Sequence, residues 1–391
     1  MSARILGLST LHSSTSPRSL LAEFGPDAPP RELPAAPADC LAYCRRLART
    51  HNENFPVLTR LLDPALVDPF AAVYAFCRWA DDLADEPSRP REHAADQATV
   101  AGSAPAPSGQ APDAPLAGPS PLDTAHDSTS SRSRLGEARL ALLAWWRDLT
   151  IAWHRGDPPT HPVFIALAEI SKPRPLPLPL RPFLDLIDAF EQDQRVIRYD
   201  TWEQLIDYCG RSANPVGRLV LALGGVEDAG AAIDHGVPTA RRHLFGKSDA
   251  LCTALQLTNF WQDVRRDLLD RDRVYLPRTL TGLDDAALRD FIASPNDPEA
   301  RVPFILALRP LVERTGELFE KSGDLHRLVP ASIRTPVWLF HAGGRSTLRR
   351  IEAMGCTTLW KRPALSRFDK SILIARAFLR SRLGSKRRSD A

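Results

Sequence analysis

Residues 68–86, DPFAAVYAFCRWADDLADE, limit the fold more than any other stretch of this chain. Tyr74, Arg78, Asp81 and Asp85 recur at helical spacing, i, i+4, i+7 and i+11, and therefore share one face of a helix. The remaining faces carry mostly Ala, Val, Phe and Trp. A helix that is apolar on all faces but one must be covered by other elements. The segment therefore predicts a central helix of a helical bundle.

A second segment repeats this pattern with different residues. In DALCTALQLTNFWQDVRRDLL, residues 249–269, Gln256, Asn259, Asp263 and Asp267 follow the spacing i, i+3, i+7 and i+11. Each polar seam ends in two aspartates four residues apart and is about 16 Å long at 1.5 Å per residue. One such seam alone is typical of a helix face exposed to water. Two of them on helices this apolar favour seams that face each other across an interior cavity.

Four aspartates that share one cavity need cations. Like charges held this close cannot all stay ionised unless a positive charge lies between them. Carboxylate and amide oxygens suit a hard cation, and Mg²⁺ commonly completes its coordination with water and substrate phosphates. The two seams therefore predict a Mg²⁺ site that a diphosphate completes.

The other periodic segments also indicate helices, and no alternating strand pattern or glycine-rich nucleotide loop is present. We expect an all-α domain of roughly ten helices. The segments with a helical pattern after residue 300 are 301–321, 331–354 and 369–383. Asp68, Asp200 and Ser248 are predicted to cap the starts of three helices, and Pro215 is predicted to kink one of them.

Two segments are rich in Pro, Ser, Gly and Ala and poor in large apolar residues, namely 1–36 and 87–134. Such a composition cannot bury enough surface to offset the entropy of ordering, so both are predicted to be flexible. The helical pattern resumes directly after the second segment, which favours an insertion in a surface loop over a domain boundary. We therefore predict one domain over residues 37–384, interrupted by this insertion and followed by a basic tail at 385–391.

Charge and composition exclude several classes of protein. The net charge of +3 gives no sign of a polyanion-binding surface, so we expect no nucleic-acid partner. No stretch of about 18 apolar residues and no signal-peptide pattern is present. The six cysteines form no CxxC pair, which favours reduced thiols in a cytoplasmic protein. The basic run RSRLGSKRR leaves two interpretations open: a solvated tail, or weak peripheral contact with the anionic inner face of a membrane.

The two seams lie in motifs that resemble those of a known family. YAFCRWADDLAD (74–85) and LTNFWQDVRRDLLDRDRVYLP (257–277) are similar to the aspartate-rich motifs of the squalene/phytoene synthases, the head-to-head trans-isoprenyl diphosphate synthases. HNENF (51–55) and YCGRSANPVG (208–217) resemble the first substrate-facing motif and the kinked central helix of that family. The resemblance covers most of the predicted domain. It implies an enzyme with a single-domain, all-α isoprenoid synthase bundle and a central apolar cavity.

The resemblance also implies roles for individual residues. The Mg²⁺ ligands would be Asp81, Asp85, Asn259, Asp263 and Asp267. These four aspartates would act in catalysis together with Tyr208, and Asp82 would support Asp81 from outside the seam. Contacts with the prenyl diphosphate substrate would come from His51, Asn54, Phe55, Tyr74, Arg78, Gln256 and Gln262. The candidates for stabilising a carbocation are Phe55, Tyr208 and Phe260, with core packing as the alternative for Phe260.

Two departures from the family pattern favour a substrate with a single diphosphate. Members that join two prenyl diphosphates typically carry Arg before the first aspartate of the second motif and often Lys in the first motif. This chain has Gln262 and Glu53 there, so two cations that would hold a second diphosphate are absent. HNENFP, FWQD and SANPVGRLVL are similar to the bacterial hydroxysqualene synthases of hopanoid biosynthesis. Those enzymes ionise presqualene diphosphate and add water, without NADPH.

Asn54, Asn214 and Gln262 are candidates for placing that water, with plain hydrogen bonds between helices as the alternative. Two other functions stay open: a presqualene diphosphate or phytoene synthase that condenses two prenyl diphosphates, and a non-catalytic assembly protein of the same fold. The presence of every seam aspartate argues against the non-catalytic protein. Contacts with other enzymes of the pathway are left open as well.

Overall fold

In the residues that this computed structural model describes, the regular secondary structure is helical. The described residues are 24–27, 36–51, 61–85, 121–172, 174, 178–226 and 239–389. Within these ranges, the one strand-like feature is an isolated bridge between Arg198 and Val274. The prediction of an all-α protein is confirmed.

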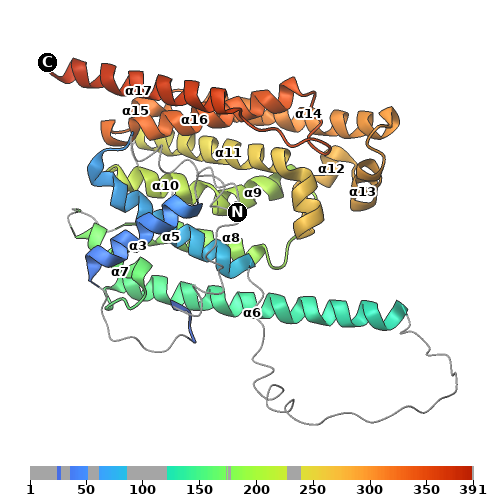
Figure 1. Ribbon diagram of the computed structural model, residues 1–391, viewed down its shortest axis with the longest axis horizontal. Helices are drawn as coiled ribbons and strands as arrows, with labels where there is room; N and C mark the ends of the chain where they lie inside the picture. Colours follow the sequence, from blue (N-terminus) through green and yellow to red (C-terminus); the bar gives the residue numbers. More distant parts are fainter. Residues whose placement is uncertain are drawn as a thin grey trace, which may run out of the picture.

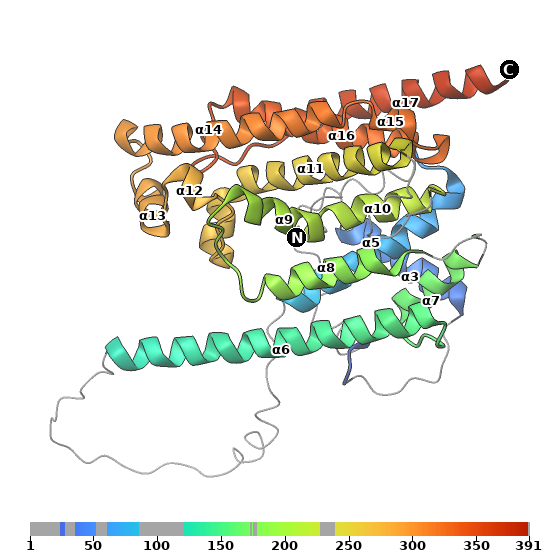
Figure 2. The same cartoon turned by 180° about the vertical axis from the view of Figure 1, so that it is seen from behind.

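The helices form successive layers. Those of the first half are α3 (Pro37–His51), α5 (Pro64–Asp85), α6 (Pro121–Arg155), α7 (Pro162–Ser171), α8 (Leu180–Gln192), α9 (Trp202–Ser212) and α10 (Asn214–Leu223). Those of the second half are α11 (Thr239–Arg271), α12 (Arg278–Thr281), α13 (Asp285–Ala293), α14 (Pro298–Lys321), α15 (Leu325–Leu328), α16 (Ala331–Ala353) and α17 (Arg367–Ser389). In Figures 1 and 2, α6 lies at one edge, α5 and α8 come next, α10 and α11 follow, and α14, α16 and α17 form the opposite edge. Because α10 packs against both α5 and α11, the two helices with acidic seams share a neighbour.

Helix α5 is buried along most of its length. It begins at Pro64, where the Asp63 carboxylate accepts a hydrogen bond from the Ala65 amide (3.0 Å) and caps the first turn. The predicted start at Asp68 is therefore wrong. The chain has two Asp-Pro pairs here, and the first one caps the helix, while Asp68 lies inside it and pairs with Arg45 of α3.

The kink predicted from Pro215 is present as a break between α9 and α10. Ala213 leaves helical geometry (φ −124°, ψ −52°), and Pro215 has no amide hydrogen with which to continue the helix. The predicted cap of α9 is wrong by one residue. Thr201 and Gln204, not Asp200, form the capping box, because each side chain accepts a hydrogen bond from the other's amide (3.2 Å).

Helix α11 is longer than the sequence indicated. It begins at Thr239, so the predicted cap at Ser248 is wrong. Ser248 is buried inside the helix, where α10 approaches so closely that a Cβ atom on Gly217 would lie 2.6 Å from the Ser248 hydroxyl oxygen. A serine at a helix crossing and a serine at a helix start look alike in sequence. The structure also places a non-helical residue, Asp263 (φ −109°, ψ 15°), inside α11.

The boundaries predicted for the flexible segments need correction. Helix α6 begins at Pro121, so residues 121–134 of the second predicted flexible segment are helical. Helix α17 extends to Ser389 and so includes residues 385–389 of the predicted basic tail. Proline is well suited to the first turn of a helix. Once the later part of α6 has formed, each further residue joins the helix at little cost in free energy. The remaining parts of the predicted segments, apart from residues 24–27 and 36, fall outside the described residues. Their predicted flexibility stays a prediction.

All six cysteines are buried and none forms a disulfide, as expected for reduced thiols. Across the described ranges, no helix combines the length and the hydropathy that crossing a bilayer requires. The three helices expected after residue 300 are present as α14, α16 and α17.

Helices α11, α14 and α16 meet at Gly344. A Cβ atom built on Gly344 would press on Leu255 of α11 and lie 2.9 Å from the Phe319 ring of α14. A Cβ atom built on the neighbouring Gly343 would meet nothing within 4 Å. The close helix packing at this glycine pair therefore depends on Gly344 and not on Gly343.

The two glycines give a matched test of this packing. We expect Gly344→Ala to lower the free energy of unfolding by about 1–3 kcal/mol, because the added methyl group overpacks a buried contact. Gly343→Ala should instead be neutral or stabilise the protein by up to about 1 kcal/mol, since alanine favours the helix. Urea denaturation followed by circular dichroism measures both. Equal effects of the two substitutions on the free energy of unfolding would contradict the close helix packing at Gly344.

Candidate active site

The acidic end of α5 is largely buried. Asp81 and Asp82 are 8% exposed and Tyr74 is 1% exposed, while Asp85, the last residue of the helix, is exposed. Arg78 Nε donates to Asp82 Oδ2 (3.0 Å), and a terminal nitrogen of Arg78 lies 3.7 Å from Asp81 Oδ2. Burial, opposed by Arg78 and reinforced by the charges of Asp81 and Asp85, raises the pKa of Asp82 to about 7. Asp82 is therefore the carboxylate that anchors Arg78.

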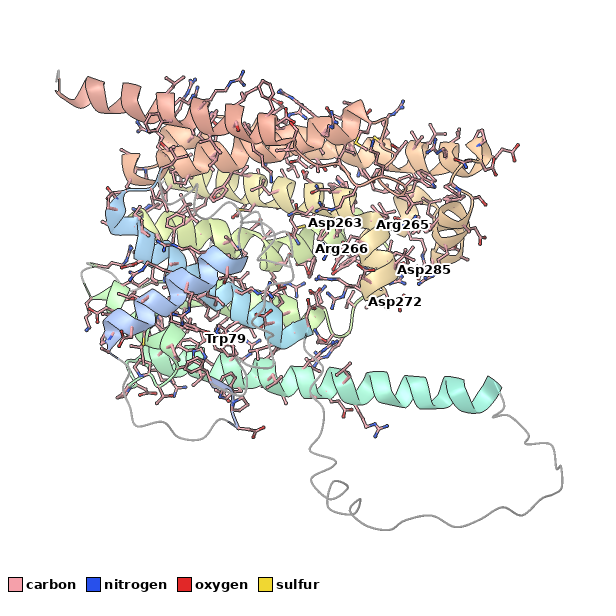
Figure 3. All side chains as sticks on the ribbon, viewed as in Figure 1. Trp79, Asp263, Arg265, Arg266, Asp272 and Asp285 are labelled. Atoms are coloured by element: carbon pink, nitrogen blue, oxygen red, sulfur yellow. The ribbon has the colours of Figure 1, made fainter. Side chains whose placement is uncertain are left out.

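The seam of α11 is buried more deeply. Gln256 and Asp267 are 1% exposed, Asp263 is 4% exposed and Asn259 is half-buried. Arg362, from the segment between α16 and α17, donates to both oxygens of Asp263, at 2.5 Å from Nε and 3.4 Å from a terminal nitrogen. Figure 3 labels Asp263 in this part of α11. A segment almost one hundred residues later in the chain thus supplies the counter-charge.

One ion pair joins the two acidic helices. Arg271, the last residue of α11, lies 3.3 Å from Oδ2 of Asp85, the last residue of α5. The C-terminal ends of both helices therefore meet at the same end of the bundle. This contact excludes an arrangement in which the two acidic motifs lie on opposite outer surfaces of the molecule.

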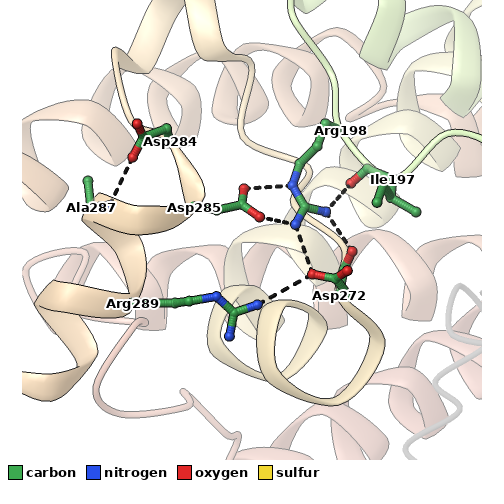
Figure 4. A network of polar contacts seen from close by, with 7 residues as sticks. All are labelled: Ile197, Arg198, Asp272, Asp284, Asp285, Ala287 and Arg289. Carbon is green, nitrogen blue, oxygen red and sulfur yellow. Dashed lines mark hydrogen bonds and ion pairs between the residues drawn. The ribbon is translucent and has the colours of Figure 1, made fainter. Parts of the chain in front are cut away.

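A polar network holds the turn that follows α11 (Figure 4). Arg198 donates from Nε to Asp285 Oδ1 (2.6 Å) and from a terminal nitrogen to the Asp272 carbonyl (2.5 Å). Arg289 lies 3.4 Å from Asp272 Oδ1. Asp272 has a φ of 52°, a left-handed conformation that aspartate adopts more readily than most residues. The network fixes this turn and with it the end of α11 that carries Arg271.

An aromatic cluster surrounds Tyr208. Phe260 of α11 stacks on Tyr275, with ring centroids 3.9 Å apart and planes 5° apart. Tyr275 also stacks on Tyr199 and Tyr208, at 5.6 and 6.0 Å. Tyr208 is fully buried and hydrogen-bonded to Asp193. Burial, with the charge of Asp193 as a further cause, raises the pKa of Tyr208 well above its usual value, so its hydroxyl stays protonated.

Five residues of this region were not singled out from the sequence: Asp193, Arg271, Arg273, Tyr275 and Arg362. Arg273 lies 3.4 Å from Asp193 and provides the counter-charge for this buried carboxylate. Arg271, Arg273 and Tyr275 belong to the second aspartate-rich motif, so a closer reading of that motif could have found them. Asp193 and Arg362 lie outside the motifs, and only the fold brings them to the site.

Two of the predicted water-placing residues bond to protein groups. Gln262 donates from Nε2 to the Pro363 carbonyl (2.5 Å), in the segment that also supplies Arg362. Asn214 of α10 accepts a hydrogen bond from the Thr253 hydroxyl of α11 (3.0 Å). Both contacts agree with the alternative of hydrogen bonds between elements of the fold.

The first substrate-facing motif lies mostly outside the described residues. His51 is the last residue of α3, and only its backbone is described. Asn54 and Phe55 fall in the undescribed range 52–60. The predicted contacts of these three residues with the substrate stay predictions.

Oxygen donors for a cation are present, and arginines pair with several of them. Among the described residues, no three Asp, Glu, His or Cys side chains form a ready-made metal cluster. Arg78, Arg271 and Arg362 each neutralise acidic residues separately. Gln256 Oε1 is buried and accepts no hydrogen bond from the described residues, so this oxygen is available to a ligand. Carboxylate and amide oxygens fit Mg²⁺, whose coordination a diphosphate would complete.

A small apolar pocket of about 30 Å³ lies between α10, α11, α15 and α16. Leu251, Cys252 and Leu255 of α11 line it, and Gln256 follows directly in the sequence. The lining is apolar, but a pocket this small holds about one or two water molecules, so it is not the site of a prenyl chain.

Comparison with known proteins gives a consistent result. The family model described as squalene/phytoene synthase matches residues 48–369. The hydroxysqualene synthase of Rhodopseudomonas palustris is 29% identical over 274 residues, 70% of each chain. The phytoene synthase of Thermus thermophilus is 30% identical over 250 residues, 62% of this chain and 75% of that one. The crystal structure of squalene synthase HpnC from Alicyclobacillus acidocaldarius is similar with a TM-score of 0.56 and 32% identity, covering 83% of this chain and 97% of that chain.

The contact between Arg362 and Asp263 can be tested by its effect on stability. We expect Arg362→Ala to lower the free energy of unfolding by about 1–3 kcal/mol, because a buried carboxylate loses its counter-charge. The control is Lys361→Ala, at an exposed neighbouring position, which should change stability by less than about 0.5 kcal/mol. In an Asp263→Asn background, Arg362→Ala should cost clearly less than in the wild type. An unchanged cost would show that the two side chains do not interact.

Proposed function

Because the chain belongs to the squalene/phytoene synthase family and is an enzyme of that type, we propose that it is a hydroxysqualene synthase. In the proposed reaction, presqualene diphosphate loses diphosphate, the resulting cyclopropylcarbinyl cation rearranges, and water adds and loses a proton to give hydroxysqualene. The carbon–oxygen bond to the diphosphate breaks, and the diphosphate keeps the electron pair. No redox cofactor is required, because the product is an alcohol formed from water.

The single observation that carries this proposal is the contact between Arg271 and Asp85. It brings the acidic ends of α5 and α11 to one end of the bundle. A diphosphate head held by Mg²⁺ would lie at this end of the bundle.

The choice of a substrate with one diphosphate rests on two further observations. Gln262 is neutral at the position where condensing members typically carry arginine, and its amide is bonded to Pro363. Relatives described as hydroxysqualene synthases are 29% identical to this chain, as in Rhodopseudomonas palustris and Sinorhizobium fredii. Both observations favour ionisation of one diphosphate over condensation of two.

The metal would be held by the two seams. The ligands would be Asp81, Asp85, Asn259, Asp263 and Asp267. Bound Mg²⁺ neutralises the diphosphate and makes it a better leaving group. The buried amide of Gln256 and the hydroxyl of Tyr74 lie on the same helix faces as these ligands and would orient the diphosphate.

The arginines would change partners when the substrate binds. Arg78, Arg271 and Arg362 each lie against carboxylates in this structure. A guanidinium group binds phosphate oxygens as well as it binds carboxylate oxygens, and the bonds are charge-assisted in both cases. Release of the aspartates to the metal would therefore leave each arginine with a new anionic partner.

The aromatic cluster would stabilise the carbocation. Aromatic faces attract cations, and the rings of Tyr208, Phe260 and Tyr275 stack together beside the α11 seam. The hydrogen bond between Tyr208 and Asp193 fixes the orientation of the phenol ring. Because the pKa of Tyr208 is raised, the ring stays neutral and cannot be consumed as a phenolate nucleophile.

Substrate choice tests the proposal directly. We expect hydroxysqualene from the purified protein when presqualene diphosphate and Mg²⁺ are supplied, and no product from farnesyl diphosphate alone. Extracted products are identified by gas chromatography and mass spectrometry, with a chelator in the control reaction. Presqualene diphosphate or phytoene formed from prenyl diphosphates would instead identify a condensing synthase.

A pair of aspartates on α11 tests the role of the seam. We expect Asp267→Asn to lower kcat by about 10²- to 10³-fold, because a carboxylate proposed to hold the Mg²⁺ that stabilises the leaving group is lost. Asp270→Asn, three residues further at an exposed position, should keep nearly full activity. Circular dichroism of both variants checks that they are folded. Similar losses in both, or in neither, would contradict the assigned role of Asp267.

A further inference from the structure

Helix α17 presents an apolar stripe away from the rest of the molecule. It lies along the outer edge of the bundle in Figures 1 and 2 and packs against α16. Its inner side carries Ala377, which is fully buried. Phe368, Ile372, Ala375 and Leu379 recur at intervals of four, three and four residues and form one stripe. At 100° per residue, this stripe lies about 180° around the helix from Ala377.

The stripe is unusually open to solvent. Phe368 is 73% exposed, the highest value for a large apolar side chain among the described residues, and Leu379 is 60% exposed. Phe378, beside the stripe, is 45% exposed. Single exposed apolar residues are ordinary, but a row of them along a helix marks a surface that contacts something else.

Positive charge surrounds this stripe. Residues 325–391 contain 15 Lys and Arg but 3 Asp and Glu, whereas the whole chain contains 50 and 47. The rest of the chain is therefore net acidic. Arg376 is exposed and lies beside the stripe, Arg380 is exposed on the side of α17 that contacts Trp338 of α16, and the sequence continues with four more cations in SRLGSKRRS. An apolar helix face bordered by Lys and Arg is typical of helices that lie in the surface of a membrane.

We propose that α17 docks this enzyme on an anionic lipid bilayer, with Phe368, Ile372 and Leu379 inserted between the headgroups. Charge complementarity favours an anionic bilayer over a second copy of the chain as the partner of this face. A second copy of the chain that used the same face would bring two strongly basic surfaces together, and like charges across an interface oppose association. Anionic headgroups instead neutralise the arginines while the stripe enters the apolar boundary.

Vesicle co-sedimentation with the full chain tests this proposal. We expect binding to vesicles of phosphatidylglycerol and phosphatidylcholine, little binding to phosphatidylcholine alone, and weaker binding as salt rises from about 0.05 to about 0.5 M. The double variant Phe368→Ser, Leu379→Ser should lower the partition coefficient about tenfold or more. Arg376→Glu should lower it about fivefold or more, with an effect that high salt reduces.

A matched variant controls for the loss of exposed apolar surface. Ile197 and Leu280, at 39% and 44% exposure, lie outside α17, and the double variant Ile197→Ser, Leu280→Ser should bind vesicles like the wild type. Equal binding of both double variants would overturn the proposal, as would equal binding to neutral and anionic vesicles. A dimer in analytical ultracentrifugation that Phe368→Ser, Leu379→Ser dissociates, together with no vesicle binding, would show that the face joins two chains. Thermal unfolding of each variant confirms that its fold is intact.

Discussion

Buried negative charge is the constraint on which the arrangement of this protein depends. Asp81, Asp82, Asp263 and Asp267 are all less than one-tenth exposed, and a buried carboxylate without a partner costs several kcal/mol. The partners come from different parts of the chain. Arg78 is on the same helix as Asp82, Arg271 is on the helix opposite Asp85, and Arg362 is in a segment between two later helices. Neutralising the seams therefore ties α5, α11 and the C-terminal part of the chain together.

The same pairs explain how such a site can be folded before its ligands arrive. In the proposed reaction, a diphosphate with Mg²⁺ would bring one anionic and one cationic partner at once. Carboxylates that bound the metal would leave arginines free for phosphate oxygens, so each buried charge would keep an opposite charge beside it. Binding would then exchange ion pairs and leave no charge unpaired. A site made of aspartates alone, without the arginines, would have to keep its carboxylates apart or protonated until the ligands arrived.

The sequence predicted what depends on local spacing and missed what depends on tertiary contacts. The helical faces of α5 and α11, the break at Pro215 and the all-α class follow from periodicity and from the chemistry of proline. The start of α5 was misplaced because two Asp-Pro pairs compete and a single sequence does not rank them. Arg362 could not be found, because only the packing of the segment after α16 brings it to Asp263. The same packing turns the Gln262 amide toward Pro363, although Gln262 lies in the motif itself.

The C-terminal segment connects the proposed active site with the surface proposed to contact lipid. Arg362 and Pro363 contact the α11 seam, and α17 begins four residues after Pro363, at Arg367. Helix α16 lies between: Val337 and Phe340 line the apolar pocket, while Trp338 lies beneath the guanidinium of Arg380 on α17. Packed helices are separated by about 8–10 Å. The α11 seam and the surface proposed to contact lipid are thus separated by one helix layer, and lipid is the phase in which a hydrocarbon product dissolves.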